Sequence, residues 1–172
     1  PNLINSLDPC LSGWLGHEKP FDFSLKYDPA YGIDRMRVGT PPVIAMAALE
    51  ASLDIWETVK IKDVRETSIQ LTDQFIKGVE QKCPMLQLIT PRLPENRGSQ
   101  VSFSFEHVYA AMQACIELGV IGDFRAPDVM RFGFTPLFID SQDVERAVET
   151  LAEIMSRDLW NDPKFQKRNK VT

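Results

Sequence analysis

The spacing of apolar residues in the second half of this chain is the feature that most constrains its fold. Between residues 85 and 157 the pattern predicts strand, strand, helix, strand, strand and helix, in that order. The clearest strand alternates Val101, Phe103 and Phe105 with serines, as a half-buried strand does. This order predicts an antiparallel-rich sheet with helices on one face, an α+β domain within the broader α/β class. The expected segments are strands at 86–90 and 101–105, a helix at 108–118, strands at 120–124 and 129–134, and a helix from Asp140 or Ser141.

Two helices are expected upstream of that domain. The first begins near Gly39-Thr40-Pro41-Pro42, where Thr40 suits an N-cap and Pro41 suits the first turn. It is apolar on most of its sides, which is typical of a helix buried in a larger assembly. The second covers about residues 59–83 and stops at a Cys-Pro pair. Residues 1–40 keep no period for long, and their dense aromatic residues suggest a loop-rich segment packed against a partner.

Composition and charge exclude several classes of protein. The chain has 172 residues, a net charge of −5 and a pI near 5.1, so generic nucleic-acid binding is not expected. No apolar run approaches the ~20 residues that cross a bilayer, so no membrane partner is expected. Three cysteines without a CxxC pair argue against a disulfide framework or a metal site and favour a reducing, cytoplasmic setting. The basic residues at 164–170 are expected to form a solvated, frayed end, and the alternative is a tail that binds a partner.

Arg131 is the most informative single charge. It lies inside a predicted strand in which Met130, Phe132 and Phe134 alternate onto one face, so that Arg131 and Gly133 share the other. A guanidinium beside a residue with no side chain leaves room for a planar anion such as a carboxylate. The alternative is an arginine that extends from an open sheet face into solvent.

Two other segments suit an anion or a cofactor. The helix start at Gly39-Thr40-Pro41-Pro42 offers free N–H groups and a hydroxyl to a phosphate, although a plain N-cap is the alternative. Trp14 and His17 bring an indole donor and an imidazole into a glycine-flanked loop. The alternative there is a packing tryptophan beside a surface histidine. We find no nucleophile or acid–base constellation in the sequence.

The order of these segments resembles the kynureninase family, and the bacterial members most strongly. The resemblance covers about residues 12–157. It implies a pyridoxal-phosphate (PLP) enzyme of fold type I, the aspartate-aminotransferase fold. It also implies a cytoplasmic homodimer with active sites at the subunit interface. The implied reaction is the hydrolysis of L-kynurenine to anthranilate and L-alanine, in tryptophan catabolism and NAD biosynthesis. The motifs that carry the resemblance are Ser12-Gly13-Trp14-Leu15-Gly16-His17, Arg37-Val38-Gly39-Thr40-Pro41-Pro42, Arg97-Gly98-Ser99-Gln100 and Met130-Arg131-Phe132-Gly133-Phe134-Thr135-Pro136-Leu137.

The resemblance also implies roles for individual residues. Trp14 and Thr40 would contact the PLP phosphate from the neighbouring subunit, and Arg131 would hold the substrate α-carboxylate. His17, in the same motif as Trp14, is grouped with the substrate-binding residues. In the family, the Schiff-base lysine and the aspartate that faces the pyridine nitrogen precede the Gly-Trp motif. No catalytic residue is therefore expected in this chain, which would be inert alone as the C-terminal part of a kynureninase.

The resemblance divides the chain into three parts. Residues 1–58 would be a remnant of the large PLP-binding domain and dimer interface, residues 59–83 an interdomain helix, and residues 84–172 the small domain. One alternative is another PLP enzyme of fold type I, such as a cysteine desulfurase or an aminotransferase. The other is a non-catalytic α+β interaction domain, which would behave as a stable monomer with little exposed apolar surface.

Overall fold

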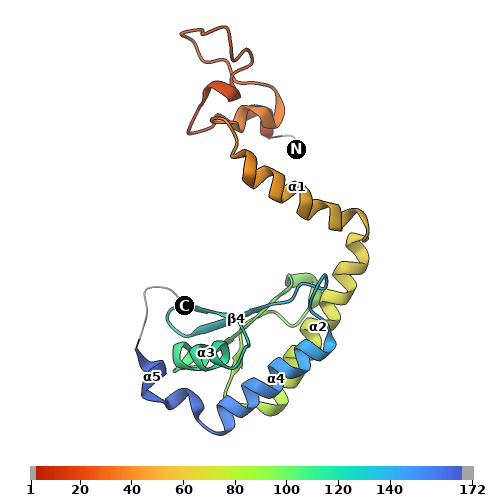
Figure 1. Ribbon diagram of the computed structural model, residues 1–172, viewed down its shortest axis with the longest axis vertical. Helices are drawn as coiled ribbons and strands as arrows, with labels where there is room; N and C mark the ends of the chain where they lie inside the picture. The colour runs from red at the N-terminus through yellow and green to blue at the C-terminus, as the bar shows by residue number, and fades with distance from the viewer. Residues whose placement is uncertain (1–2, 168–172) are drawn as a thin grey trace. The chain divides into compact units, whose positions relative to one another are not determined.

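The protein is described by a computed structural model over residues 3–167, and the described residues form two compact units that divide between Thr58 and Val59. The first unit holds three short 3-10 turns followed by one long helix, α1 (Figure 1). The second unit begins with a long helix, α2, and continues into a four-stranded sheet with further helices. The short turns of the first unit are Ile4–Ser6, Trp14–Gly16 and Gly32–Met36, and α1 is Val43–Glu57.

The sheet of the second unit is antiparallel throughout, with strand order β1-β2-β4-β3. Helices α3 and α4 lie on the same side of it (Figure 1). The element order confirms the predicted α+β pattern. The bounds are α2 Ile61–Lys82, β1 Gln87–Leu88, β2 Gln100–Ser104, α3 Val108–Glu117, β3 Asp123–Arg125, β4 Val129–Gly133 and α4 Ser141–Ser156.

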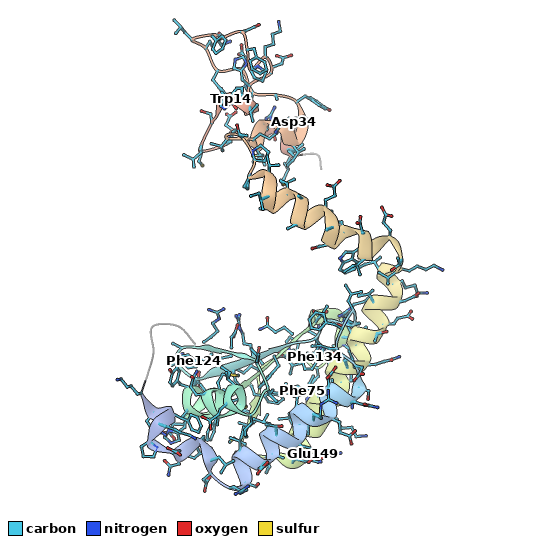
Figure 2. All side chains as sticks on the ribbon, in the orientation of Figure 1. Trp14, Asp34, Phe75, Phe124, Phe134 and Glu149 are labelled. Atoms are coloured by element: carbon cyan, nitrogen blue, oxygen red, sulfur yellow. The ribbon has the colours of Figure 1, made fainter. Side chains whose placement is uncertain are left out.

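One face of the sheet is the core of the unit. Phe75 of α2 is fully buried, with its ring 5.0 Å from the rings of both Phe132 and Phe134 and 6.1 Å from that of Phe103. Figure 2 shows Phe75 between the helices and the sheet. Met130 is also fully buried. The predicted alternation of β4 is therefore confirmed, with its aromatic residues packed under α2.

The strand expected at 120–124 begins three residues later in the sequence, as β3 (Asp123–Arg125). Gly119 adopts φ +86° and ends α3, as its position after Leu118 predicts. The Val120 N–H then donates to the Cys115 carbonyl at 2.8 Å, because a helix end needs donors for its last carbonyls. The Val120 N–H is thereby used at the end of the helix, and pairing with β4 begins at Asp123.

Helix α4 begins as predicted. The Asp140 carboxylate accepts from the N–H groups of Gln142 and Asp143, and the Asp143 carboxylate accepts from the Asp140 N–H at 3.0 Å. The expectation of a frayed end after α4 is wrong for the residues that the structure describes. Pro163–Gln166 forms α5, in which Phe165 is buried and Lys164 pairs with Glu117. Residues 168–170 of the basic segment lie outside the described residues.

Helix α1 corrects another expectation. It begins at Val43 with Pro42 as its N-cap, and no side chain caps it, so the prediction of Thr40 as N-cap is wrong. Proline disfavours helical backbone dihedral angles in the residue that precedes it, and both Thr40 and Pro41 precede a proline. The helix can therefore start only after Pro42, where the first bond is Met46 N–H to the Pro42 carbonyl at 3.0 Å.

The first unit has almost no core. Among residues 3–58 the buried ones are Gly16 and Arg35, and every residue of α1 is exposed. Arg35 connects the loops by donating to the carbonyls of Ala30, Asn5 and Leu7. No helix in the described part of the chain is both long and apolar enough to span a membrane.

Candidate functional site

The Gly-Trp motif and the segment before α1 lie against each other in the first unit. A side-chain carbon at Gly13 would overlap the backbone of Val38. One at Gly16 would lie 2.7 Å from the Arg35 carbonyl and 2.8 Å from the Tyr27 hydroxyl. Both glycines are thus required by close backbone approach. The structure thus brings the motif of Trp14 against Val38, two residues before Thr40.

Trp14 is about half exposed and its ring meets that of Phe21 edge-on at 5.6 Å. The residues around it line a pocket with about 390 Å³ of free space, made of Trp14, His17, Lys19, Pro20, Phe23, Ser24, Leu25 and Tyr27. The Tyr27 hydroxyl is buried and has no hydrogen-bond partner among the described residues. An unpaired buried hydroxyl is costly, so the Tyr27 hydroxyl is an unused polar group of this unit.

His17 uses both ring nitrogens within its own loop. Nδ1 accepts from the Lys19 N–H at 2.9 Å, and Nε2 lies 3.1 Å from the Lys26 carbonyl. These partners assign the proton to Nε2. The imidazole therefore joins the two ends of the 17–26 loop, and the substrate-binding role of His17 stays a prediction.

Thr40 is exposed in the extended segment ahead of α1. The first N–H groups of a helix have no partner within it, and they carry part of the positive end of the helix dipole. The Thr40 hydroxyl, the Trp14 indole N–H and these amides are all hydrogen-bond donors, the kind of group that binds an anion such as phosphate.

Arg131 occupies the open face of the sheet in the second unit. As predicted, it lies on the face opposite the core, and its side chain is 30% exposed. Its Nε donates to one oxygen of Asp123 and its Nη2 to the other, both at 2.6 Å. The two residues are direct partners in the β3–β4 ladder. The guanidinium therefore already holds one carboxylate, supplied by the protein itself.

This ion pair shifts the titration of both groups. The hydrogen bonds from Arg131, helped by the charges of Arg131 and Arg125, hold the pKa of Asp123 below its usual value, while partial burial opposes them. The same hydrogen bonds raise the pKa of Arg131 above its ordinary value. Both groups are thus charged at neutral pH.

Small residues border Arg131 on the same face. Ser102 is its ladder partner on β2, and Gly133 follows two residues later on β4. A side-chain carbon placed at Gly133 would meet no atom within 4 Å. The space predicted beside Arg131 is therefore present.

The motif Arg97-Gly98-Ser99-Gln100 has a structural role, because it attaches a loop to α2. The Arg97 side chain is 1% exposed and pairs with Asp73 of α2. It also donates to the carbonyls of Pro91 and Arg92, so it fixes the 91–97 loop onto α2. The Ser99 hydroxyl accepts from Ser68 of α2 at 2.7 Å.

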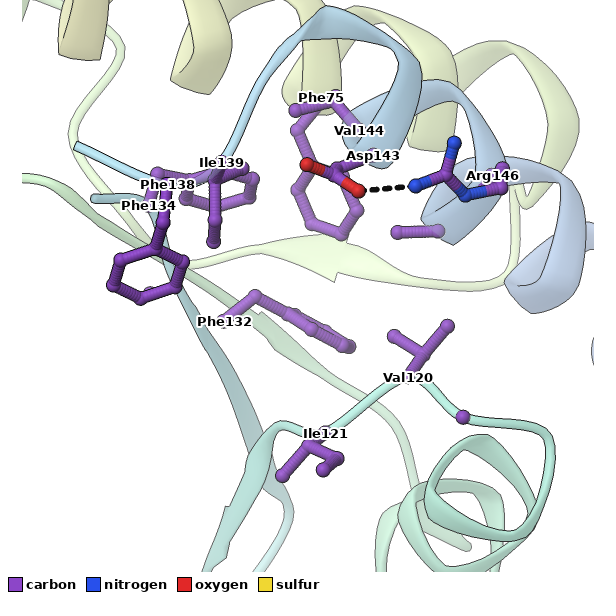
Figure 3. A pocket seen from close by; sticks show the side chains of 13 residues that line it. Phe75, Val120, Ile121, Phe132, Phe134, Phe138, Ile139, Asp143, Val144 and Arg146 are labelled. Atoms are coloured by element: carbon purple, nitrogen blue, oxygen red, sulfur yellow. Dashed lines mark hydrogen bonds and ion pairs between the residues drawn. The ribbon is translucent and has the colours of Figure 1, made fainter. Parts of the chain in front are cut away.

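Another pocket, in the second unit, lies on the core side of β4 (Figure 3). It has about 350 Å³ of free space, and its lining is mostly apolar. An Asp143–Arg146 ion pair lies among the lining side chains. Arg131 does not line it, because that side chain lies on the opposite face of the strand. The pocket and the guanidinium are therefore separate features.

The buried thiols and the His, Cys, Asp and Glu side chains of the described residues offer no further site. Burial raises the pKa of Cys83 to about 11 and that of Cys115 to about 12, so both are inert thiols at neutral pH. Within residues 3–167 no three His, Cys, Asp or Glu side chains are grouped as metal ligands would be.

Comparison with solved structures defines the class of fold. The chain superimposes on a cysteine desulfurase from Thermococcus onnurineus NA1 with a TM-score of 0.71 and 16% identity, covering 91% of this chain and 41% of that one. A cystine C-S lyase, C-DES, matches with a TM-score of 0.69 and 20% identity over 88% of this chain and 40% of that one. A variant of that lyase carries glycine covalently linked to its PLP cofactor. The fold is that of the C-terminal part of PLP enzymes of fold type I.

Sequence comparison defines the family. Residues 64–151 match the family described as the kynureninase C-terminal domain, and the chain belongs to that family. It is 44% identical to the kynureninase of Pseudomonas fluorescens over 174 aligned residues, covering 100% of this chain and 42% of the relative. The kynureninase of Burkholderia pseudomallei is also 44% identical, over 94% of this chain and 39% of its own length. The chain spans about two fifths of the length of these relatives.

Proposed function

We propose that this chain is the C-terminal part of a kynureninase, which hydrolyses L-kynurenine to anthranilate and L-alanine. The observation that carries the proposal is the Arg131 guanidinium, set on an open sheet face above Gly133 in a member of this family. A substrate that is an α-amino acid needs such a partner for its carboxylate. The parts proposed within the protein are residues 1–58 from the large domain, 59–83 as the interdomain helix and 84–172 as the small domain.

The cofactor that the family implies is PLP, and we assign its phosphate to the first unit. Trp14 and Thr40 would supply an indole N–H and a hydroxyl, and the exposed start of α1 would add backbone donors. When bound, PLP supplies an electron sink for the amino-acid substrate. This chain's residues would hold its phosphate and the substrate carboxylate. His17 would keep the Trp14 loop in shape and border the substrate.

The proposed assembly is a homodimer. Residues 3–58 bury almost nothing of their own, and α1 exposes Val43, Ile44, Met46, Leu49, Leu53, Ile55 and Trp56. An apolar helix of this kind needs a covering surface. Sedimentation of the complete protein should give a dimer, and a monomer at micromolar concentration would contradict this assembly. We also propose a cytoplasmic location, because the three cysteines are free thiols, as in a reducing compartment. Recovery of the protein from a secreted fraction would contradict this location.

The proposed activity is tested on the complete protein that contains this chain. With PLP it should release anthranilate, followed by its fluorescence, and L-alanine in equal amounts from L-kynurenine. L-cysteine is the matched substrate for the rival desulfurase activity. Release of sulfide or persulfide from cysteine, with no anthranilate from kynurenine, would overturn the proposal.

Trp14→Phe should weaken retention of PLP in that protein. The change removes one N–H donor to a charged phosphate, a contact worth about 1.5–3 kcal/mol, so the Kd for PLP should rise by roughly 10- to 100-fold. Equilibrium dialysis of the cofactor measures this. Trp160→Phe is the matched control, because Trp160 stacks on His107 in the second unit, 4.6 Å between centroids. Equal cofactor loss from both variants would refute the role of Trp14.

A further inference from the structure

A guanidinium has two edges on which a carboxylate can form paired hydrogen bonds. One edge consists of Nε and Nη2, and the other of Nη1 and Nη2. In Arg131 the first edge is filled by Asp123, at 2.6 Å for both bonds. Among residues 3–167 no hydrogen bond or ion pair of Arg131 uses Nη1. The second edge is therefore available to a ligand.

The contact is set by the ladder rather than by flexible surface groups. Asp123 on β3 and Arg131 on β4 are direct partners in the register, so their side chains leave the sheet on the same face. The pairing fixes where the Nε edge points, and a planar fork fixed at one edge has a fixed second edge. Ser102, the partner on β2, is too short to fill the remaining side.

The local charge leaves one position for an anion. Asp123 is also 3.3 Å from Nη2 of Arg125, so two guanidinium groups share one carboxylate. The cluster therefore keeps one positive charge in excess. An incoming monocarboxylate would balance it, and Gly133, which has no side chain and open space around it, does not obstruct the approach.

We propose that Asp123 is a positioning residue for substrate: it holds Arg131 by Nε and Nη2 and so aims the Nη1 side at the α-carboxylate. The inference rests on the proposed kynureninase function and deepens it. The rival role for Asp123 is an internal carboxylate that competes with substrate for the same fork. The two roles differ in sign, because loss of a positioning residue weakens substrate binding and loss of a competitor strengthens it.

The test compares Asp123→Asn with the unchanged complete protein, loaded with PLP. Asparagine keeps the size of the side chain but offers only one acceptor and no charge. We expect the KM for L-kynurenine to rise about tenfold with kcat changed less than about twofold, the scale of a misaligned contact. PLP content should be unchanged. Asp63→Asn, an exposed carboxylate in the first turn of α2, is the matched control and should change neither constant.

A second measurement separates positioning from a general structural effect. Kynuramine is kynurenine without its α-carboxylate, so its binding should not depend on the Arg131 fork. Asp123→Asn should weaken inhibition by L-alanine about tenfold and leave inhibition by kynuramine unchanged. In an Arg131→Ala background, Asp123→Asn should not raise KM further, because a positioning residue has no effect once the arginine that it holds is removed.

The outcomes separate the two proposals. If the unchanged protein does not hydrolyse kynurenine, the proposed function fails before any variant is compared. If it does, an unchanged or lowered KM in Asp123→Asn overturns the positioning role alone. So does equal weakening of alanine and kynuramine. Should Asp123→Asn fold poorly by near-UV circular dichroism, Asp123→Glu serves instead. It keeps the charge but moves it by one methylene, so it should raise KM less than tenfold and spare kynuramine.

Discussion

Replacing Arg131 by alanine in the complete PLP-containing protein is expected to raise the KM for L-kynurenine about 100-fold and to leave PLP bound. The change removes a charge-assisted fork, and about 2.7 kcal/mol of lost binding corresponds to a factor of 100. It also leaves Asp123 without its main partner, which adds a repulsive carboxylate to the same face. Steady-state kinetics together with the PLP absorbance measure both parts of the expectation.

Arg157→Ala is the control for that variant. Arg157 pairs with Glu153 at the exposed end of α4, and its removal takes the same charge from the second unit without touching the open sheet face. It should leave KM and PLP content as they were. An Arg131→Ala protein that loses PLP but keeps its affinity for kynurenine would show that the residue serves the cofactor instead.

Phe75→Ala is expected to destabilise the second unit by about 3–5 kcal/mol. Phe75 is fully buried and its ring contacts three other phenylalanines, so truncation leaves a cavity that the rigid sheet cannot close. Amide exchange of β2 measures this loss within the unit, because its ladder opens only when the core does.

Phe138→Ala provides the comparison for Phe75. Phe138 is 77% exposed, and its truncation should change stability by less than about 0.5 kcal/mol. Similar losses of protection in the two variants would contradict a core centred on Phe75. A loss confined to Phe75→Ala would support the packing of α2 under β2 and β4.

Patterns that depend on neighbours in sequence predicted the fold well. Met130 and Phe132 are buried where the period of two places them, and Asp140 caps α4 through a local hydrogen-bond arrangement. Gly119 ends α3 for the same local reason. In each case the determining interaction lies within a few residues, so the sequence contains it directly.

Features that depend on a second constraint were missed. Thr40 has the chemistry of an N-cap, but two successive prolines delay the helix. Val120 has the pattern of a strand residue, but the end of α3 takes its N–H. Neither competing demand is visible when one period is considered at a time.

The partner of Arg131 was missed although a signal for it existed. The expected strands at 120–124 and 129–134 lie on both sides of Ala126-Pro127-Asp128, whose residue types are typical of a turn. A hairpin closed by that turn pairs Arg125 with Val129 and, two residues further out, Asp123 with Arg131, as observed. Counting outward from the turn would therefore have placed the carboxylate beside the guanidinium. The approach of Gly13 to Val38 has no comparable signal, because loop contacts follow no period.

The most direct test of the account is a crystal structure of the complete PLP-containing protein with an unreactive kynurenine analogue that keeps the α-carboxylate. We expect a carboxylate oxygen about 3 Å from Arg131 Nη1, with Asp123 still bonded to Nε and Nη2. An analogue whose carboxylate binds another cation, with no contact to Arg131, would contradict the account.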